Sequence, residues 1–317
     1  MRLRKTLTFM AITVALATSA PAHAADKLTV LLDWFINPDH APLYVALERG
    51  YFAEAGLAVD FIEPADPNAP PRLVAAGKAE IAISYQPQLH LQVAAGLPVA
   101  RIGTLVATPL SSLVVLRDGP IRSIADLKGR KVGYSVGGFE DAMLGAMLNK
   151  NGLSLDDVTL INVNFNLSPA LISGRVDAVI GAYRNFELNQ LDILKRPGRA
   201  FYVEEEGVPA YDELIVIAHR DKLADPRLAE FVAAIERGAQ YLVNHQEESW
   251  KLFVKGREKK LDNELNRRAW RDTLARFALR PGALDHGRYR RFAAFLKDRG
   301  LIKTIVPLDR YAVELGR

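Results

Sequence analysis

The sequence of 317 residues contains no cysteine. This absence excludes disulfide bonds, thiolate metal sites and a cysteine nucleophile. It also excludes a lipid attached to an N-terminal cysteine, which anchors many exported proteins. We therefore expect a protein with no direct membrane anchor.

Long apolar runs are also absent, apart from one stretch near the N-terminus. Three of the first five residues are basic, residues 7–16 are largely apolar, and Ala22-His23-Ala24 forms an A-x-A cleavage site. This order is typical of a secretory signal peptide, and the apolar stretch is too short to span a membrane. Residues 1–24 are therefore predicted to be cleaved, which leaves a chain that begins at Ala25 in the periplasm.

An excess of either charge is missing once the signal peptide is removed. The full chain has 41 basic and 37 acidic side chains, and the signal contains three basic and no acidic ones, which leaves 38 against 37. A net charge near +1 provides no electrostatic surface for nucleic acid or for an anionic membrane. The remaining chain of about 290 residues is long enough for two domains with their own cores.

Short apolar runs alternate with helical patterns over most of the mature chain. Strands are predicted at 28–32, 57–63, 79–84, 99–107, 112–117, 130–134, 158–164, 176–181 and 213–218. Helices are predicted between strands at 139–150 and 167–174, and after the last strand at 227–245, 247–255, 262–278 and 286–299. This alternation predicts parallel α/β units.

Two similar apolar strands bracket the middle of the chain. They are SSLVVLRDG at 111–119 and DELIVIAHRD at 212–221. A chain that leaves one lobe on a strand, forms a second lobe and returns on another strand has a paired hinge, which permits closure around a ligand. The sequence therefore predicts one lobe from 25–112 plus 217–317 and a second lobe from 113–216.

Aromatic and short polar residues recur in the loops next to these strands. The loops are DWFINPDH from 33, YQPQ from 85, SVGGFED from 135, AYRNFE from 182 and VPAYDE from 208. Ligands of open α/β sheets bind beyond the carboxyl ends of the strands, and this composition suits a flat, apolar-faced ligand with hydrogen-bonding edges. The candidate ligand-binding residues are Trp34, Asn37, Tyr85, Gly137, Phe139, Tyr183, Glu187, Asp212 and Glu213.

Each candidate also has a structural interpretation. Trp34 is equally typical of core or hinge packing, and Phe35 is expected in the core. Gly137 fits the tight turn before the following helix, because no phosphate-binding glycine motif surrounds it. Asp212 and Glu213 are also typical of solvated residues at the start of a strand.

Catalytic and metal-binding patterns are scarce. Five histidines remain after removal of the signal, and no two of them have the H-x-x-x-H spacing of a metal site. A nucleophile elbow of the G-x-S-x-G type is absent as well. Tyr85 and Tyr183 fit a domain interface with hydrated hydroxyl groups as well as a binding site. The sequence therefore predicts a binding protein with no catalytic residue, no metal site and no cofactor.

Several segments together resemble a known family. WFINPDH at 34–40 and GAYRNFE at 181–187 are its more specific motifs, while GYFAEAGL and ADLKGRKVG are shared with nitrate, sulfonate and taurine receptors. Over the mature length, the chain resembles the proteins that bind a pyrimidine precursor of thiamin for ABC importers. The resemblance implies a type II periplasmic-binding fold, with a formylated aminomethyl-aminopyrimidine held between aromatic rings.

Roles for individual residues follow from this resemblance. It implies that Trp34 and Tyr183 stack on the ligand, while Asn37 and Glu187 form hydrogen bonds with its edges. It also implies a receptor, not an enzyme, that delivers its solute to the permease of an importer. We expect this receptor to be a monomer. The residues that would line the wall of the site are Tyr85 and Phe139.

Three alternatives stay open at the level of sequence. The chain also resembles a pyrimidine synthase with the same fold, although the export signal and the lack of that family's cysteine-rich segment argue against an enzyme. A receptor for sulfonate or nitrate would need an unpaired cation, for which Arg184 is the only candidate in these loops. A wider aromatic ring, such as a flavin or a purine, would satisfy the same pocket chemistry.

Overall fold

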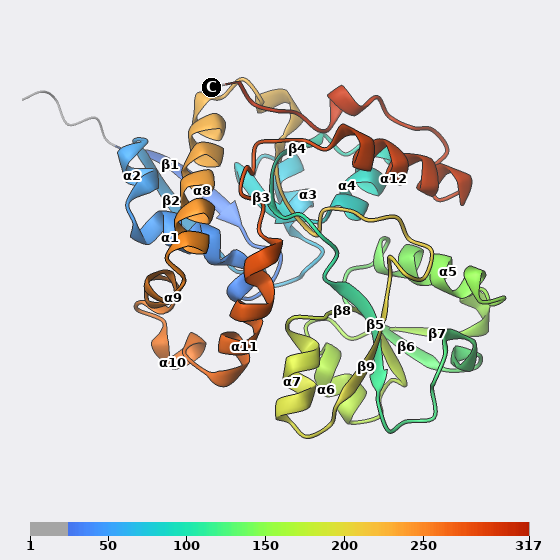
Figure 1. Cartoon of the computed structure of the whole chain (residues 1–317). Coiled ribbons are helices and arrows are strands. Elements are labelled where there is room, and N and C mark those ends of the chain that lie inside the picture. The colour runs from blue at the N-terminus through green and yellow to red at the C-terminus, as the bar shows by residue number, and fades with distance from the viewer. Residues whose placement is uncertain (1–24, 317) are drawn as a thin grey trace, which may run out of the picture.

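The protein has two α/β lobes, each organised around a five-stranded sheet (Figure 1). The structure is a computed structural model, and it describes residues 25–316. The predicted signal peptide at 1–24 therefore lies outside the described residues. Among residues 25–316, no helix combines the length and the apolar character that a membrane span requires.

The first lobe contains both ends of the described chain. Its sheet has the strand order β2 (Leu57–Ile62), β1 (Asp26–Leu31), β3 (Ile81–Ser84), β10 (Leu214–His219) and β4 (Val99–Val106). The short 3-10 helix η1 (Pro38–His40) connects β1 to the first α-helix. The helices of this lobe are α1 (Ala41–Glu48), α2 (Tyr51–Glu54), α3 (Pro70–Ala75), α4 (Gln86–Ala94), α8 (Pro226–Asn244), α9 (Gln246–Val254), α10 (Glu258–Leu261), α11 (Glu264–Thr273) and α12 (His286–Asp298).

The second lobe is formed by the middle of the chain. Its sheet has the strand order β7 (Thr159–Asn162), β6 (Lys131–Tyr134), β8 (Ala178–Tyr183), β5 (Ser111–Leu116) and β9 (Gly198–Tyr202). Its helices are α5 (Glu140–Lys150), α6 (Leu167–Ile172) and α7 (Glu187–Ile193).

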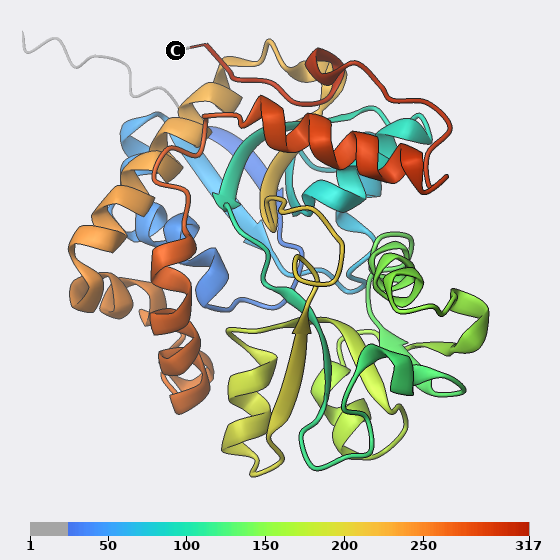
Figure 2. The same cartoon turned by 45° about the vertical axis from the view of Figure 1, so that its right-hand side comes forward.

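Each sheet contains one reversed strand, which corrects the expectation of purely parallel units. β10 is antiparallel to β3 and β4, and β5 is antiparallel to β8 and β9. These two strands arrive from the other lobe, so each begins where the other strands of its sheet end (Figure 2). The carboxyl ends of the other four strands in each lobe consequently face the opposite lobe.

Two segments, 107–110 and 203–213, connect the lobes and run side by side (Figures 1 and 2). Glu213 joins them, because its Oε2 accepts hydrogen bonds from the backbone N–H groups of Leu110 and Ser111, at 2.6 and 2.8 Å. The predicted lobe boundaries at 112/113 and 216/217 fall inside β5 and β10, a short way beyond these connections.

Local sequence explains several element boundaries. The helix α8 begins after Asp225, whose Oδ1 accepts a hydrogen bond from the N–H of Arg227, and Pro226 occupies its first turn. All nine predicted strands are present, with boundaries within two residues. The unpredicted strand β9 lies at a sheet edge, and four of its five residues are only partly buried, so its sequence has no clear apolar pattern.

Candidate functional site

A narrow pocket lies between the lobes, next to the carboxyl ends of β1, β3 and β8. Its cavity volume is about 30 Å³, well below the roughly 300–1,000 Å³ of sites that hold a small ligand. The opposite walls of the pocket are therefore close together in this structure.

Six of the nine predicted site residues line this pocket. The first lobe contributes three of them and the second lobe contributes the other three, so neither lobe forms the pocket alone. Their roles toward a ligand stay predictions. The six residues are Trp34, Asn37, Tyr85, Phe139, Tyr183 and Glu187.

The other three predicted residues, Gly137, Asp212 and Glu213, do not line the pocket. The N–H of Gly137 donates to Asn68 Oδ1 at 3.0 Å, where the lobes meet. Asp212 forms an ion pair with Arg288 of α12, and Glu213 binds the backbone of the first connection between the lobes. Both acids are buried, so the expectation of solvated residues is wrong, and each has a structural partner instead of a place in the pocket.

Aromatic rings from the two lobes meet around the pocket. Tyr85 stacks on Phe139, with ring centroids 5.0 Å apart and an interplanar angle of 27°. Trp34 meets Phe165 edge to face at 4.6 Å, and Phe35 lies 4.5 Å from the same ring. Phe35 is 42% exposed, so the expectation that it belongs to the core is wrong. Its packing partner is an aromatic ring of the other lobe.

Buried hydrogen bonds hold the loop after β1. Asn37 caps η1, because its Oδ1 accepts the N–H of Asp39 at 2.8 Å, while its Nδ2 donates to a loop carbonyl at 3.0 Å. His40 Nδ1 accepts the N–H of Asn37, so the ring proton is on Nε2, which donates to Asp33 Oδ1 at 2.9 Å. The hydroxyl of Tyr85 donates to Asp33 Oδ2 at 2.8 Å. Both the oxygen and the nitrogen of the Asn37 amide therefore form hydrogen bonds within the loop.

Three further carboxyl groups line the pocket without a cationic partner among the described residues. Burial raises the pKa of Asp39 to about 6, that of Glu187 to about 7 and that of Glu140 to about 8. Glu187 accepts the N–H of Tyr183 at 2.7 Å, and Glu140 accepts the N–H of Ser135 at 2.7 Å. Asp39 Oδ2 and the hydroxyl of Tyr183 have no hydrogen-bond partner within residues 25–316. The pocket can therefore accept several hydrogen bonds from a ligand.

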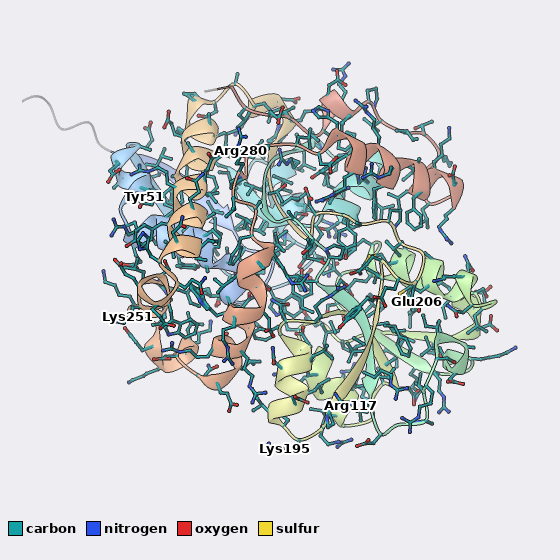
Figure 3. All side chains as sticks on the ribbon, in the orientation of Figure 1. Tyr51, Arg117, Lys195, Glu206, Lys251 and Arg280 are labelled. Atoms are coloured by element: carbon teal, nitrogen blue, oxygen red, sulfur yellow. The ribbon has the colours of Figure 1, made fainter. Side chains whose placement is uncertain are left out.

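Cationic side chains lie away from these carboxyl groups. In the described part of the chain, no lysine or arginine lines the pocket. Arg184 forms hydrogen bonds with both carboxylate oxygens of Glu204, at 2.7 and 2.8 Å, and stacks over Tyr202. Arg117 and Lys195 lie at the far end of the second lobe (Figure 3). An anionic ligand would consequently meet carboxylates with no cation to compensate them.

Within residues 25–316, no group of three or more histidine, aspartate and glutamate side chains is arranged to hold a metal ion. Asp33 and His40 form the one acid–histidine pair that the structure describes at the pocket. The second oxygen of Asp33 accepts a hydrogen bond from the Tyr85 hydroxyl, and the second ring nitrogen of His40 accepts one from the backbone N–H of Asn37.

The structure adds lining residues that the sequence did not single out. Asp33 and Asp39 lie in the same loop as Trp34, and Glu140 follows Phe139. Their positions in loops that follow predicted strands could therefore have identified them as candidates. Phe165 also follows a strand, β7, but its role depends on contact with the other lobe, which local sequence does not indicate. The added lining residues are Asp33, Asp39, Glu140, Leu167, Gly181 and Phe186.

Gly181 is required by the position of Glu140. A Cβ atom at Gly181 would lie 2.2 Å from Glu140 Oε1, and the backbone φ is +87°. We expect Gly181→Ala to displace the Glu140 carboxylate and weaken ligand binding, in addition to a cost of about 1–2 kcal/mol from backbone strain. Gly174 has a φ of +73° with no atom within 4 Å of a Cβ, so Gly174→Ala is the matched control for strain alone.

Calorimetric titration and thermal melting of the two glycine variants test this expectation. Both should melt a few degrees below the parent. Only Gly181→Ala should lose affinity. Equal affinity in the two variants would show that the Glu140 position has no influence on the ligand.

Sequence comparisons place the chain among proteins connected with thiamin. The profile of the family described as "NMT1/THI5 like" matches residues 37–249. A Haemophilus influenzae protein whose name contains "thiamine biosynthesis protein" is 49% identical over 97% of this chain and 98% of its own length. The "Formylaminopyrimidine-binding protein" of Halalkalibacterium halodurans is 36% identical over 75% of this chain and 72% of its own length. A "4-amino-5-hydroxymethyl-2-methylpyrimidine phosphate synthase" of Uromyces fabae is 31% identical over 73% of this chain and 71% of its own length.

Solved structures share the fold at low sequence identity. A Candida albicans protein described as having the generic periplasmic binding protein fold has a TM-score of 0.71 and 19% identity, over 92% of this chain and 97% of that one. The alkanesulfonate-binding protein of Xanthomonas axonopodis pv. citri has a TM-score of 0.70 and 17% identity, over 90% and 97%. The predicted two-lobed periplasmic-binding fold is therefore confirmed.

Proposed function

Because this chain belongs to the NMT1/THI5-like family, we propose that it is a periplasmic receptor for an aminopyrimidine precursor of thiamin. The proposed ligand is N-formyl-4-amino-5-aminomethyl-2-methylpyrimidine. The proposed partner is the permease of an ABC importer, to which the receptor delivers this solute. The name of the formylaminopyrimidine-binding relative supports the ligand, and the periplasmic-binding fold supports the role in solute binding.

This proposal rests mainly on the acidic residues that line the pocket and on the absence of basic residues from its described lining. Carboxyl groups from both lobes surround a narrow space between aromatic rings, and no described lysine or arginine lines it. An ionised carboxylate only accepts hydrogen bonds, so a matching ligand must donate them. An aminopyrimidine has a flat ring, an exocyclic amine that donates, and a ring nitrogen that donates when protonated. Sulfonate and nitrate have no such donors, and above about pH 7 the ionised carboxylates of Asp39 and Glu187 would repel them.

A synthase is the second candidate, because a relative with that name is 31% identical. We favour a receptor for two reasons that concern this chain itself. The first 24 residues have the features of an export signal, which suits a protein outside the cytoplasm. The chain also lacks cysteine, and therefore the cysteine-rich segment expected of the synthase group.

Mass spectrometry of bound small molecules tests the proposed function. The full chain would be produced in a Gram-negative host, purified from the periplasm without denaturation, and then denatured to release its ligand. We expect a mature N-terminus at Ala25 and a released compound with the mass of the formylated aminopyrimidine. A stoichiometric sulfonate, flavin or purine would overturn the ligand, and an uncleaved N-terminus would overturn export.

The buried carboxyl groups also predict an unusual pH dependence of stability. Asp39, Glu187 and Glu140 have pKa values of about 6, 7 and 8 in the folded chain, above the ordinary 3.8 for aspartate and 4.5 for glutamate. The folded state therefore binds more protons than the unfolded state between about pH 4 and pH 8, so the free energy of unfolding falls as the pH rises through this window. We expect the ligand-free protein to melt several degrees lower at pH 8 than at pH 5.

Melting curves from pH 5 to pH 8 measure this dependence. Glu140→Gln and Glu187→Gln should each reduce the slope, because an amide does not ionise. A saturating aminopyrimidine should reduce it too, since its donors stabilise the ionised carboxylates. A slope identical in the parent and both variants would contradict the assignment of the pH dependence to these groups.

A further inference from the structure

Three buried side chains join the lobes beside the pocket, and we call them the interlobe latch: Asp39, Asn185 and Thr273. Asn185 Nδ2, from the second lobe, donates to Asp39 Oδ1 at 2.6 Å and to Thr273 Oγ1 at 2.7 Å, both in the first lobe. Thr273 Oγ1 also lies 2.9 Å from Asp39 Oδ1. None of the three residues is more than 1% exposed. The two hydrogen bonds of Asn185 can exist only when the lobes are together.

The latch connects three separate parts of the chain. Asn185 lies between β8 and α7, Thr273 is the last residue of α11, and the helices α7 and α11 lie side by side (Figure 1). The neighbours of the Asn185 amide fix its orientation. Its NH₂ group has two hydrogens, one of which it donates to the Asp39 carboxylate and the other to the Thr273 hydroxyl oxygen. Reversal of the amide would set its oxygen against the carboxylate.

Asp39 belongs to both the latch and the pocket. Its Oδ1 accepts the latch bonds, whereas its Oδ2 is buried without a partner in the described chain, and the side chain lines the pocket. Water can solvate this oxygen when the lobes are apart. Closure of an empty pocket removes that water and leaves the oxygen unbonded, which costs free energy. A ligand donor supplies the missing hydrogen bond.

We propose that Asp39 makes closure of the lobes conditional on a ligand with an N–H donor, because Oδ2 accepts from the ligand while Oδ1 accepts from Asn185. This inference rests on the proposed function and adds a ligand-binding residue to the same pocket. Asn185 and Thr273 are positioning residues that act through Asp39. Ligand shifts the population toward the closed state because only the closed, occupied state satisfies both carboxylate oxygens.

The variant Asp39→Asn separates the two functions of this side chain. Its amide oxygen can still accept the latch bonds, but an NH₂ group replaces Oδ2 and meets the ligand donor with another donor. We expect calorimetric titration with the formylated aminopyrimidine to show an affinity at least about tenfold lower than the parent. X-ray scattering of the ligand-free variant should give a smaller radius of gyration, since an unbonded amide opposes closure less than an unbonded carboxylate.

The variant Asn185→Ala removes the latch and leaves the pocket carboxylate in place. Asn189→Ala is its matched control, because Asn189 of α7 donates through Nδ2 to Asp272 Oδ2 of α11 at 2.7 Å, a bond that also joins the lobes but at an exposed position. Stopped-flow measurement should show ligand dissociation about tenfold faster in Asn185→Ala, and less than about twofold faster in Asn189→Ala.

The outcomes separate this inference from the proposed function. If the parent binds the aminopyrimidine and Asp39→Asn binds it equally well, the role of Asp39 is overturned and the proposed function stands. If the parent binds no aminopyrimidine but ligand-free Asp39→Asn is more compact than the parent, the closure role is supported and the proposed ligand is overturned. Equal dissociation rates in Asn185→Ala and Asn189→Ala would overturn the latch.

Discussion

Glu187→Gln should bind the formylated aminopyrimidine at least tenfold more weakly than the parent. Glu187 begins α7, lines the pocket and is only 8% exposed. A carboxylate can accept hydrogen bonds from both the exocyclic amine and a protonated ring nitrogen of the ligand. A glutamine side chain has one accepting oxygen and one donating NH₂ group, so one of the two ligand donors would face another donor. Hydrogen bonds to a charged group contribute about 1.5–3 kcal/mol, which corresponds to about a tenfold change or more.

The structure allows this substitution to be interpreted cleanly. Glu187 Oε2 accepts the N–H of Tyr183 at 2.7 Å, and the oxygen of a glutamine can accept the same bond, so the helix start is retained. Glu230→Gln on the exposed face of α8 is the matched control for loss of one negative charge. Isothermal titration with a small alkanesulfonate completes the comparison. A gain in sulfonate affinity in Glu187→Gln would favour an anion receptor and contradict the aminopyrimidine.

The second large effect is expected for Trp34. Stacking of a base-like ring on an aromatic side chain contributes about 1–3 kcal/mol, so Trp34→Ala should weaken binding by about one to two powers of ten. Trp34→Phe keeps an aromatic face and should lose much less. Intrinsic fluorescence can follow the binding, because the other two tryptophans, Trp250 and Trp270, pack edge to face in the core at 5.3 Å.

Phe165→Ala separates stacking on a ligand from packing between the lobes. Trp34 meets Phe165 of the second lobe at 4.6 Å, so Trp34→Ala removes this contact as well. Phe165→Ala removes only the contact between the lobes. We expect the loss of affinity to be several times larger for Trp34→Ala. Equal losses would indicate that Trp34 stabilises closure and does not stack on the ligand.

Much of the pocket could be predicted because strand ends are visible in the sequence. Trp34, Tyr85 and Tyr183 come from strands far apart in the chain, and they meet because the carboxyl ends of parallel strands face the same cleft. The predicted export signal, the resemblance to the family and the bracketing strands also came from local sequence patterns. The reversed direction of β5 and β10 did not, since strand direction depends on which lobe the chain comes from.

Residues whose roles depend on distant partners could not be predicted. Glu213 follows a loop that matches the others in composition, but its partner is the backbone of Leu110, 103 residues away. Asp39 was visible in the loop after β1, yet its bond to Asn185 of the other lobe spans 146 residues. Phe35 resembles a core residue locally, but it is 42% exposed and packs against Phe165 of the other lobe. Tertiary contacts assign these roles.

Equilibrium dialysis of the parent protein against an equimolar mixture of the formylated aminopyrimidine and a small alkanesulfonate tests the central claim most directly. The mature protein, freed of any ligand retained from the cell by unfolding and refolding, would be dialysed to equilibrium and both compounds quantified on each side of the membrane. Our account predicts that the protein retains one aminopyrimidine per chain and no sulfonate. Retention of the sulfonate without the aminopyrimidine would contradict it.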